Sequence, residues 1–216
     1  MSLKAGEYDI DSSNGRLLLR TFRRGLAAKA GHDLLIEASV WHGHVSVPDN
    51  PAAQPAVSVE VDMSQFEVLE GTGGVKALTD ADRQEIKQTM RKPLRSDQHP
   101  VATFTSTNVQ IDGEQAAIDG QLTLGGQTHP LRLDVRQQAE GVVTGTANVV
   151  QTTWGIKPYT GFLGALKLRD DVQVEFLVTL PGGRRPRTSS LLAAPHSRVS
   201  ERDRRSWYRV GSRGNE

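Results

Sequence analysis

The side chains that could carry chemistry in this sequence are six histidines and a set of carboxylates, because the chain has no cysteine. Without cysteine, disulfides and thiolate metal sites are excluded. Acyl transfer would have to use a serine or threonine, and the sequence contains no GxSxG nucleophile elbow. We therefore predict that the protein is not an enzyme, with no catalytic residue, no metal and no cofactor.

The segment Gly31-His32-Asp33 lies where a turn is expected to enter a strand. In one interpretation, His32 and Asp33 are polar contacts for a ligand head group at the mouth of a barrel. In another, they form a hydrogen-bonded turn in which His32 binds backbone carbonyls. A third alternative uses the two side chains as an acid–base pair in an enzyme.

Two further motifs have simple structural interpretations. His42 and His44 share one face of a predicted strand, but a complete zinc site needs three or four ligands. We expect both to be polar residues on the solvent face. The glycine-rich segment 125–130 has the composition of a phosphate-binding loop, but such loops lead into a helix N-terminus. Because a strand follows here, we predict a hairpin turn.

Alternating apolar and polar residues, broken by glycine turns, predict consecutive antiparallel strands with one buried face. The candidate strands are 8–10, 17–22, 34–47, 57–63, 102–111, 116–124, 131–135, 142–152 and 172–180. This pattern predicts an all-β fold, a single antiparallel β-barrel of about eight strands. A barrel of that size is wide enough to hold one slender ligand.

Within the long segment 34–47, the apolar positions change parity. Leu34, Ile36, Ala38 and Val40 occupy even positions, whereas Val45 and Val47 occupy odd ones. A one-residue shift of this kind indicates a β-bulge, the usual means of curling a sheet into closure. We place the bulge near Gly43.

One amphipathic helix is expected among the strands. Thr79 and Asp82 have the spacing of a capping box, and Ile86, Met90 and Leu94 recur every four residues. Pro93 disfavours helical geometry at the residue before it, so we predict a helix over about 79–91. We expect it to cover one end of the barrel, the alternative being packing against the side wall.

The barrel domain is predicted over residues 1–180, followed by a disordered tail over 181–216. The tail contains nine arginines and three acidic residues, and four of its 36 residues are Leu, Ile, Val or Phe. With Trp207 and Tyr208 nearby, these arginines could make weak contacts with an anionic membrane or a nucleic acid. The opening MSLKAGEYDIDSS has no apolar core, so we expect a cytoplasmic protein.

Several segments together resemble the YceI-like family, bacterial lipocalin-like barrels associated with polyisoprenoid lipids. They are YDIDSSNGRLLLRTF, AGHDLLIEASVWHGHVSV, the helix leading into HPVATFTS, GQLTLGGQTHPLRLDV, TGTANVVQTTWGI and the closing VEFLVTL. The resemblance covers roughly residues 7–180. It implies an elongated apolar cavity for a prenyl chain, and it makes a homodimer plausible.

On this resemblance we predict non-catalytic binding, carriage or sequestration of an amphiphilic isoprenoid, such as a quinone or a prenyl derivative. His32 and Asp33 are the candidates for head-group contacts. The candidate cavity residues are Phe22, Leu34, Ile36, Phe66, Met90, Phe104, Leu122, Leu124, Trp154, Phe162 and Leu166. The alternatives are an interaction protein whose basic tail engages anionic partners, or a cavity enzyme that uses His32 and Asp33.

Overall fold

The computed structural model describes residues 3–50 and 52–180, and the predicted tail 181–216 lies outside the described residues. Fourteen strands and one α-helix make up most of this region. The strands are β1 (Gly6–Asp11), β2 (Gly15–Thr21), β3 (Arg23–Arg24), β4 (Asp33–Ala38), β5 (Trp41–Val47), β6 (Ala56–Asp62), β7 (Phe66–Thr72), β8 (Val101–Asp112), β9 (Gln115–Leu124), β10 (Gln127–Ala139), β11 (Val142–Val150), β12 (Thr160–Gly161), β13 (Leu166–Leu168) and β14 (Asp171–Thr179).

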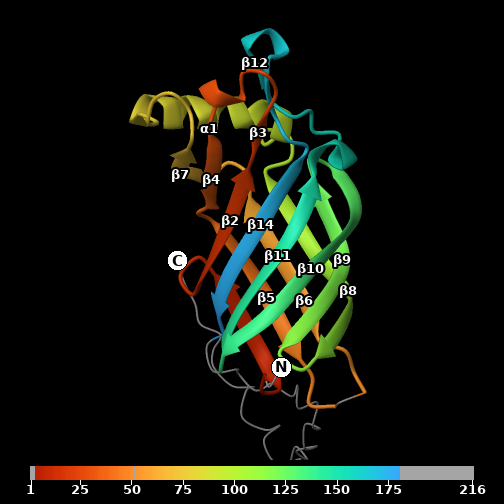
Figure 1. Ribbon diagram of the computed structural model, residues 1–216. Helices are drawn as coiled ribbons and strands as arrows, with labels where there is room; N and C mark the ends of the chain where they lie inside the picture. The colour runs from red at the N-terminus through yellow and green to blue at the C-terminus, as the bar shows by residue number, and fades with distance from the viewer. Residues whose placement is uncertain (1–2, 51, 181–216) are drawn as a thin grey trace, which may run out of the picture. The chain divides into compact units, whose positions relative to one another are not determined.

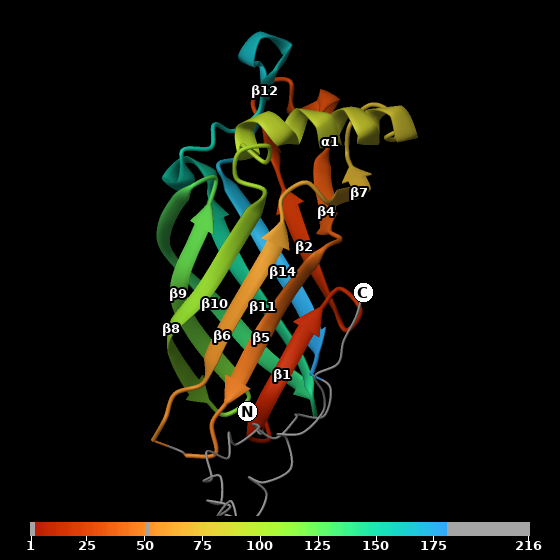
Figure 2. The ribbon, with the colours of Figure 1, turned by 180° about the vertical axis from the view of Figure 1, so that it is seen from behind.

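The large sheet is antiparallel throughout, in the order β1-β5-β6-β8-β9-β10-β11-β14-β2-β4-β7. Strands β4 and β5 are two halves of one bent strand, and β6 and β7 are two halves of the next. Backbone hydrogen bonds bridge both interruptions, from Ser39 N to Gln65 O and from Asp62 N to Val40 O, each 3.0 Å. With each bent strand counted once, the pairing that starts at β2 passes through eight strands and returns to β2. They are β2, β4–β5, β6–β7, β8, β9, β10, β11 and β14. Among the described strands, β1 is paired with β5 alone. The predicted all-β barrel is confirmed (Figures 1 and 2).

The parity change lies at Ser39 and Val40, so the predicted position near Gly43 is wrong. Val40 is 49% exposed, whereas Trp41 is 5% exposed and faces the interior. The chain bends there because it changes partners: β4 pairs with β2 and β7, and β5 pairs with β1 and β6. The bend, rather than a glycine, moves the apolar face from even to odd positions.

The predicted helix is present as α1, Asp80–Leu94, with both hydrogen bonds of the Thr79–Asp82 capping box. It extends past residue 91, so the predicted end was too early. Pro93 lies in the last turn, and Arg95, with φ 55°, ends the helix by donating its backbone N–H to the carbonyls of Arg91 and Lys92. A proline in the last turn removes only one intrahelical hydrogen bond.

Helix α1 lies across one end of the barrel, called here the helix end (Figures 1 and 2). Arg83 Nη1 holds it there by donating to the carbonyls of Val68 and Leu69, both at 2.7 Å. Lys87 adds an ion pair to Glu67 of β7 at 2.7 Å. A small sheet in the order β12-β13-β3 stands at the same end.

Among the described residues, no helix is long and apolar enough to cross a membrane.

A histidine on the outer wall fastens β1 to β5. His44 of β5 lies between two carboxylates of β1, with Nε2 2.7 Å from Glu7 Oε2 and Nδ1 3.0 Å from Asp9 Oδ1. Ser46 Oγ donates to the other oxygen of Glu7 at 2.8 Å. The hydrogen bonds to Asp9 and then to Glu7 raise the pKa of His44 above its ordinary value of 6.5. The charged imidazole thus stabilises the pairing of β1.

We predict that replacing His44 costs more stability in mild acid than in base. Because the folded-state pKa is raised, the stabilisation is fully present below the unfolded value and is lost as the pH rises through the folded value. In urea unfolding, the free energy of unfolding of His44→Gln should be lower than that of wild type by roughly 0.5–1 kcal/mol near pH 5.5 and by less near pH 8.5. The difference is small because the imidazole is half exposed.

Ser46→Ala is the control, because it removes a hydrogen bond to the same Glu7 without removing a group that titrates in this range. Its loss of stability should be about equal at both pH values. If the His44→Gln difference were also independent of pH, the charged clamp would be disproved.

Candidate functional site

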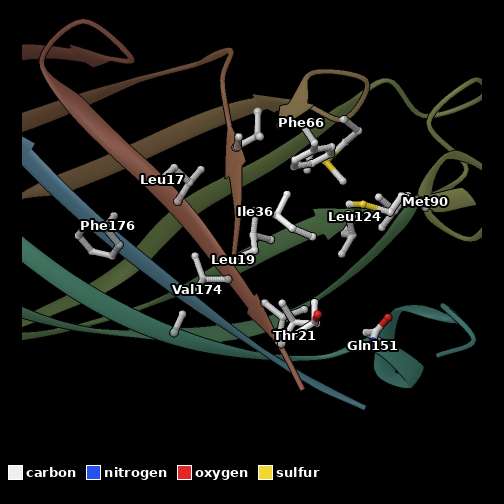
Figure 3. A pocket seen from close by; sticks show the side chains of 18 of the residues that line it. Leu17, Leu19, Thr21, Ile36, Phe66, Met90, Leu124, Gln151, Val174 and Phe176 are labelled. Atoms are coloured by element: carbon white, nitrogen blue, oxygen red, sulfur yellow. The ribbon is translucent and has the colours of Figure 1, made fainter. Parts of the chain in front are cut away.

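The barrel encloses a cavity of about 1510 Å³. Every barrel strand contributes inward side chains to its wall, and most of these are Val, Leu, Ile or Ala. An eight-stranded barrel can be filled by its side chains or can hold one ligand, and here the inward side chains leave the centre open. Leu17, Leu19 and Val174 point inward yet are only partly buried, because they face open space instead of other side chains (Figure 3).

Two glycines in the wall leave room for the rings that the cavity does contain. A Cβ on Gly145 would collide with the ring of Phe176 and with the carbonyl of Asp134. A Cβ on Gly120 would likewise collide with the ring of Phe104. Because neither glycine carries a side chain, each ring rests against the neighbouring strand. The rings therefore thicken the wall without spanning the cavity.

The polar residues of the cavity wall are confined to the helix end. The rest of the wall, down to Leu133, Val143 and Leu180, is apolar apart from the indole Nε1 of Trp41. The polar residues are Thr21, His32, Lys76, Asp82, Glu85, Thr89, Lys92, Arg95, Gln151, Lys157, Tyr159 and Thr160. Asp82 accepts hydrogen bonds from the backbone and side chain of Thr79, and these bonds lower its pKa. The cavity is thus amphiphilic along its axis.

Most of the predicted cavity residues line this wall. They are Leu34, Ile36, Phe66, Met90, Phe104, Leu122, Leu124 and Leu166. Figure 3 shows Ile36, Phe66, Met90 and Leu124 gathered near the helix end. The side chain of Phe162 lies outside what the structure describes.

The placement predicted for Phe22 and Trp154 is wrong, because neither lines the cavity. Phe22 follows inward-facing Thr21 and so points outward, where the guanidinium of Arg169 lies 5.1 Å from its ring centroid. Trp154 lies beyond β11 in a 3-10 turn, Gln151–Trp154, and is 3% exposed. Its Nε1 donates to the carbonyl of Leu122 at 3.0 Å, so it packs at the rim as part of the protein core.

His32 and Asp33 have separate partners. His32 lines the cavity at the helix end, with Nε2 2.7 Å from the carbonyl of Lys76. Asp33 is not part of the cavity wall, and its Oδ1 accepts a hydrogen bond from the backbone N–H of Arg23 at 2.7 Å. This geometry is that of a hydrogen-bonded turn, and it does not arrange the two side chains as an acid–base pair. A head-group contact by His32 stays a prediction.

The other two motifs lie away from the cavity. His42 and His44 are on the outer wall, and the described residues contain no cluster of three or more His, Asp or Glu that could hold a metal. The segment 125–130 begins with a two-residue hairpin turn, in which Gly125 and Gly126 have φ values of 57° and 81°. Positive φ at both positions is what such a turn requires.

Two wall residues carry buried polar atoms that sequence reasoning did not single out. The Nε1 of Trp41 and the Oγ1 of Thr21 are buried, and neither has a hydrogen-bond partner among the described residues. Both side chains line the cavity. Alternation along β2 could have shown that Thr21 faces inward. The sequence prediction missed Trp41, because a parity change near Gly43 would leave residue 41 on the outer face.

Comparison with known proteins gives consistent results. A YceI-like domain is recognised over residues 8–180. A UPF0312 protein of Pectobacterium carotovorum is 50% identical over 48 residues, 22% of this chain and 25% of that protein. The YceI protein of Shigella flexneri is 38% identical over 79 residues, 36% of each chain. The matched segments thus span between a quarter and about a third of these relatives.

A solved structure shares the fold. The crystal structure of BcnA from Burkholderia cenocepacia superposes with a TM-score of 0.58, covering 78% of this chain and 98% of BcnA. The two sequences are 16% identical, so the likeness concerns the fold alone.

We predict that Gly145→Ala destabilises the barrel by about 1–3 kcal/mol, because the new methyl group must displace the ring of Phe176 or the backbone of β10. Urea unfolding measures the loss. The neighbouring outward residue supplies the control, since Thr146→Ala lies on the exposed face and should change stability by less than about 0.5 kcal/mol. Equal effects of the two substitutions would contradict the packing described here.

Proposed function

The chain belongs to the YceI-like domain family, and from this premise we propose that it binds an amphiphilic polyisoprenoid-type lipid, such as a quinone or a prenyl derivative. In this proposal the protein carries or sequesters the lipid without converting it. The family is one of lipocalin-like barrels associated with polyisoprenoids, which fits the architecture described above.

The observation that carries the proposal is the open apolar cavity of about 1510 Å³ along the barrel. Ligand pockets for drug-sized molecules are commonly about 300–1000 Å³, so this cavity has room for a longer guest. Burial of a methylene group stabilises by about 0.8 kcal/mol, so each five-carbon unit contributes up to roughly 3–4 kcal/mol before ordering costs. Affinity in such a site grows with the length of the buried chain.

The distribution of polar residues supports one orientation of the lipid. An isoprenoid chain would lie in the apolar part, toward Leu133 and Val143, with its head group at the helix end. There Lys92, Lys157 and His32 offer polar contacts. The opposite orientation would bury a polar head among aliphatic side chains without hydrogen-bond partners, which is costly.

The alternatives have less support. An enzyme using His32 and Asp33 is not favoured, since the two side chains hold separate backbone groups. The tail arginines lie outside the described residues, so contacts with an anionic partner through the tail stay a prediction. So do a homodimer and residence in the cytoplasm, which cross-linking and fractionation of the native host would test.

We predict that affinity for prenyl alcohols rises from about two isoprene units upward and then levels off at the length of the cavity. Fluorescence or calorimetric titration of a chain-length series measures this. Val174→Trp, which places a bulky ring inside the cavity, should weaken binding of the longer members by at least about tenfold. Gln173→Trp adds the same ring on the outward side of β14 and should have little effect. Equal affinity for short and long chains would disprove the proposal.

Native mass spectrometry of protein purified from its own host is a second test. We expect a co-purifying lipid of isoprenoid mass that is absent from Val174→Trp. Co-purifying nucleic acid would instead favour the interaction protein with a basic tail.

A further inference from the structure

We propose that the helix end of the barrel docks on an anionic membrane surface, with the mouth of the cavity facing the lipid. The docking surface consists of the loops around α1 and the small β12-β13-β3 sheet, which stand together at this end (Figures 1 and 2). This inference does not depend on what occupies the cavity. It concerns the described barrel and not the arginine-rich tail.

Large apolar side chains project into solvent from this surface. Leu26, between β3 and a short 3-10 turn, is 101% exposed, and Leu163, between β12 and β13, is 110% exposed. Val75 and Tyr159 are 80% and 48% exposed and also line the cavity, so they mark its rim. Fully exposed leucines make no contact that stabilises the fold. Exposed leucines at this end of the barrel fit insertion into an apolar layer.

Uncompensated positive charge surrounds these apolar side chains. Eight Lys and Arg side chains in the described part of the chain form no ion pair, and only Arg136 of these lies away from the helix end. The other seven are Arg24, Lys29, Lys76, Lys92, Arg95, Lys157 and Lys167. The described carboxylates at this end that form no ion pair are fewer: Glu70, Asp82, Glu85 and Asp170. The helix end therefore carries an excess of positive charge.

The opposite end of the barrel differs in charge, although Ile111, which is 51% exposed, also lines the cavity there. Its turns carry Asp49, Asp112, Glu114 and Glu140, and only Glu140 is paired, with Lys4 at 3.4 Å. An anionic surface therefore attracts one end of the barrel and repels the other. This asymmetry fixes the orientation of docking, because each basic residue near such a surface strengthens binding by about fivefold at low salt, whereas carboxylates oppose it.

The combination favours a lipid surface over a nucleic acid. A nucleic-acid site would need the basic residues to follow a groove, with aromatic side chains available for stacking. Here the basic residues belong to several separate elements and connections at one end of the barrel, and the exposed apolar side chains among them are mainly aliphatic. A membrane uses both features at once, since headgroups pair with the cations while the leucines enter the acyl boundary.

Co-sedimentation of the full chain with vesicles tests the proposal. We expect binding to phosphatidylcholine vesicles containing about 30% phosphatidylglycerol, little binding to phosphatidylcholine alone, and a decrease from about 0.05 to 0.5 M salt. The triple variant Arg24→Gln, Lys29→Gln, Lys167→Gln should bind at least about tenfold more weakly. Leu26→Ser with Leu163→Ser should also reduce binding. These side chains are exposed and lie outside the barrel wall, so the variants should unfold at the same urea concentration as wild type.

The matched controls are Arg136→Gln, a cation without an ion pair near the far end of β10, and Leu177→Ser, a 45% exposed leucine on the outer face of β14. Neither should change vesicle binding. The proposal is overturned if the full chain does not bind anionic vesicles. It is also overturned if the mouth variants bind like wild type while Arg184→Gln, Arg185→Gln, Arg187→Gln in the tail abolishes binding.

The lack of cysteine allows a direct measurement of orientation. A single Leu163→Cys carrying an environment-sensitive fluorophore should shift to shorter wavelength when anionic vesicles are added. The same fluorophore on Asp112→Cys, at the far end, should not shift. A shift at the far end alone, or equal shifts at both ends, would overturn the proposed orientation.

Discussion

The rest of the structure depends on a mismatch between the size of the barrel and the size of its inward side chains. The eight strands of this barrel enclose more space than its inward side chains fill, and the rings of Phe104 and Phe176 rest against the wall at Gly120 and Gly145. Protein interiors are normally close-packed, so such a space is maintained only by a rigid wall. The hydrogen-bonded ladders supply that rigidity. They run from β5 round to β2 and close through the pairing of β2 with β4, while β1 forms an edge of the sheet on β5.

Closure in turn depends on the bend between β4 and β5. At Ser39 and Val40 the strand exchanges β2 for β1 on one side. On the other side it stays beside the bent strand β6–β7, because backbone hydrogen bonds with Asp62 and Gln65 continue the pairing across the bend. The bend turns Trp41 inward and exposes Val40. It also brings β5 beside β1, where His44 of β5 lies between Glu7 and Asp9 of β1 and fastens the two strands together. One local irregularity thus decides both the shape of the cavity and the side chains that face it.

Sequence reasoning succeeded where the cause is local and failed where the cause is tertiary. The helix start followed from Thr79 and Asp82, whose mutual hydrogen bonds involve only neighbouring residues. The Gly125-Gly126 turn was likewise a local requirement. The bend at Ser39 was misplaced because it reflects a change of strand partners, which no residue type marks. The same error led the prediction to miss Trp41. Trp154 was misassigned because a buried ring whose N–H donates to a backbone carbonyl cannot be told from a cavity residue by sequence.

The charge pattern of the helix end could not be predicted from the sequence for the same reason. The chain has a formal net charge of +1, which hides how charge is distributed along the barrel axis. In an up-and-down meander every second connection reaches the same end, so Lys29, Lys76 and Lys157 lie at the same end of the barrel although they are far apart in sequence. The alternate connections, which contain the acidic residues Asp49, Glu114 and Glu140, reach the other end. The polar part of the cavity wall and the basic, leucine-tipped surface therefore coincide. A lipid whose head group lies at that mouth would leave the barrel directly into the surface that the mouth contacts.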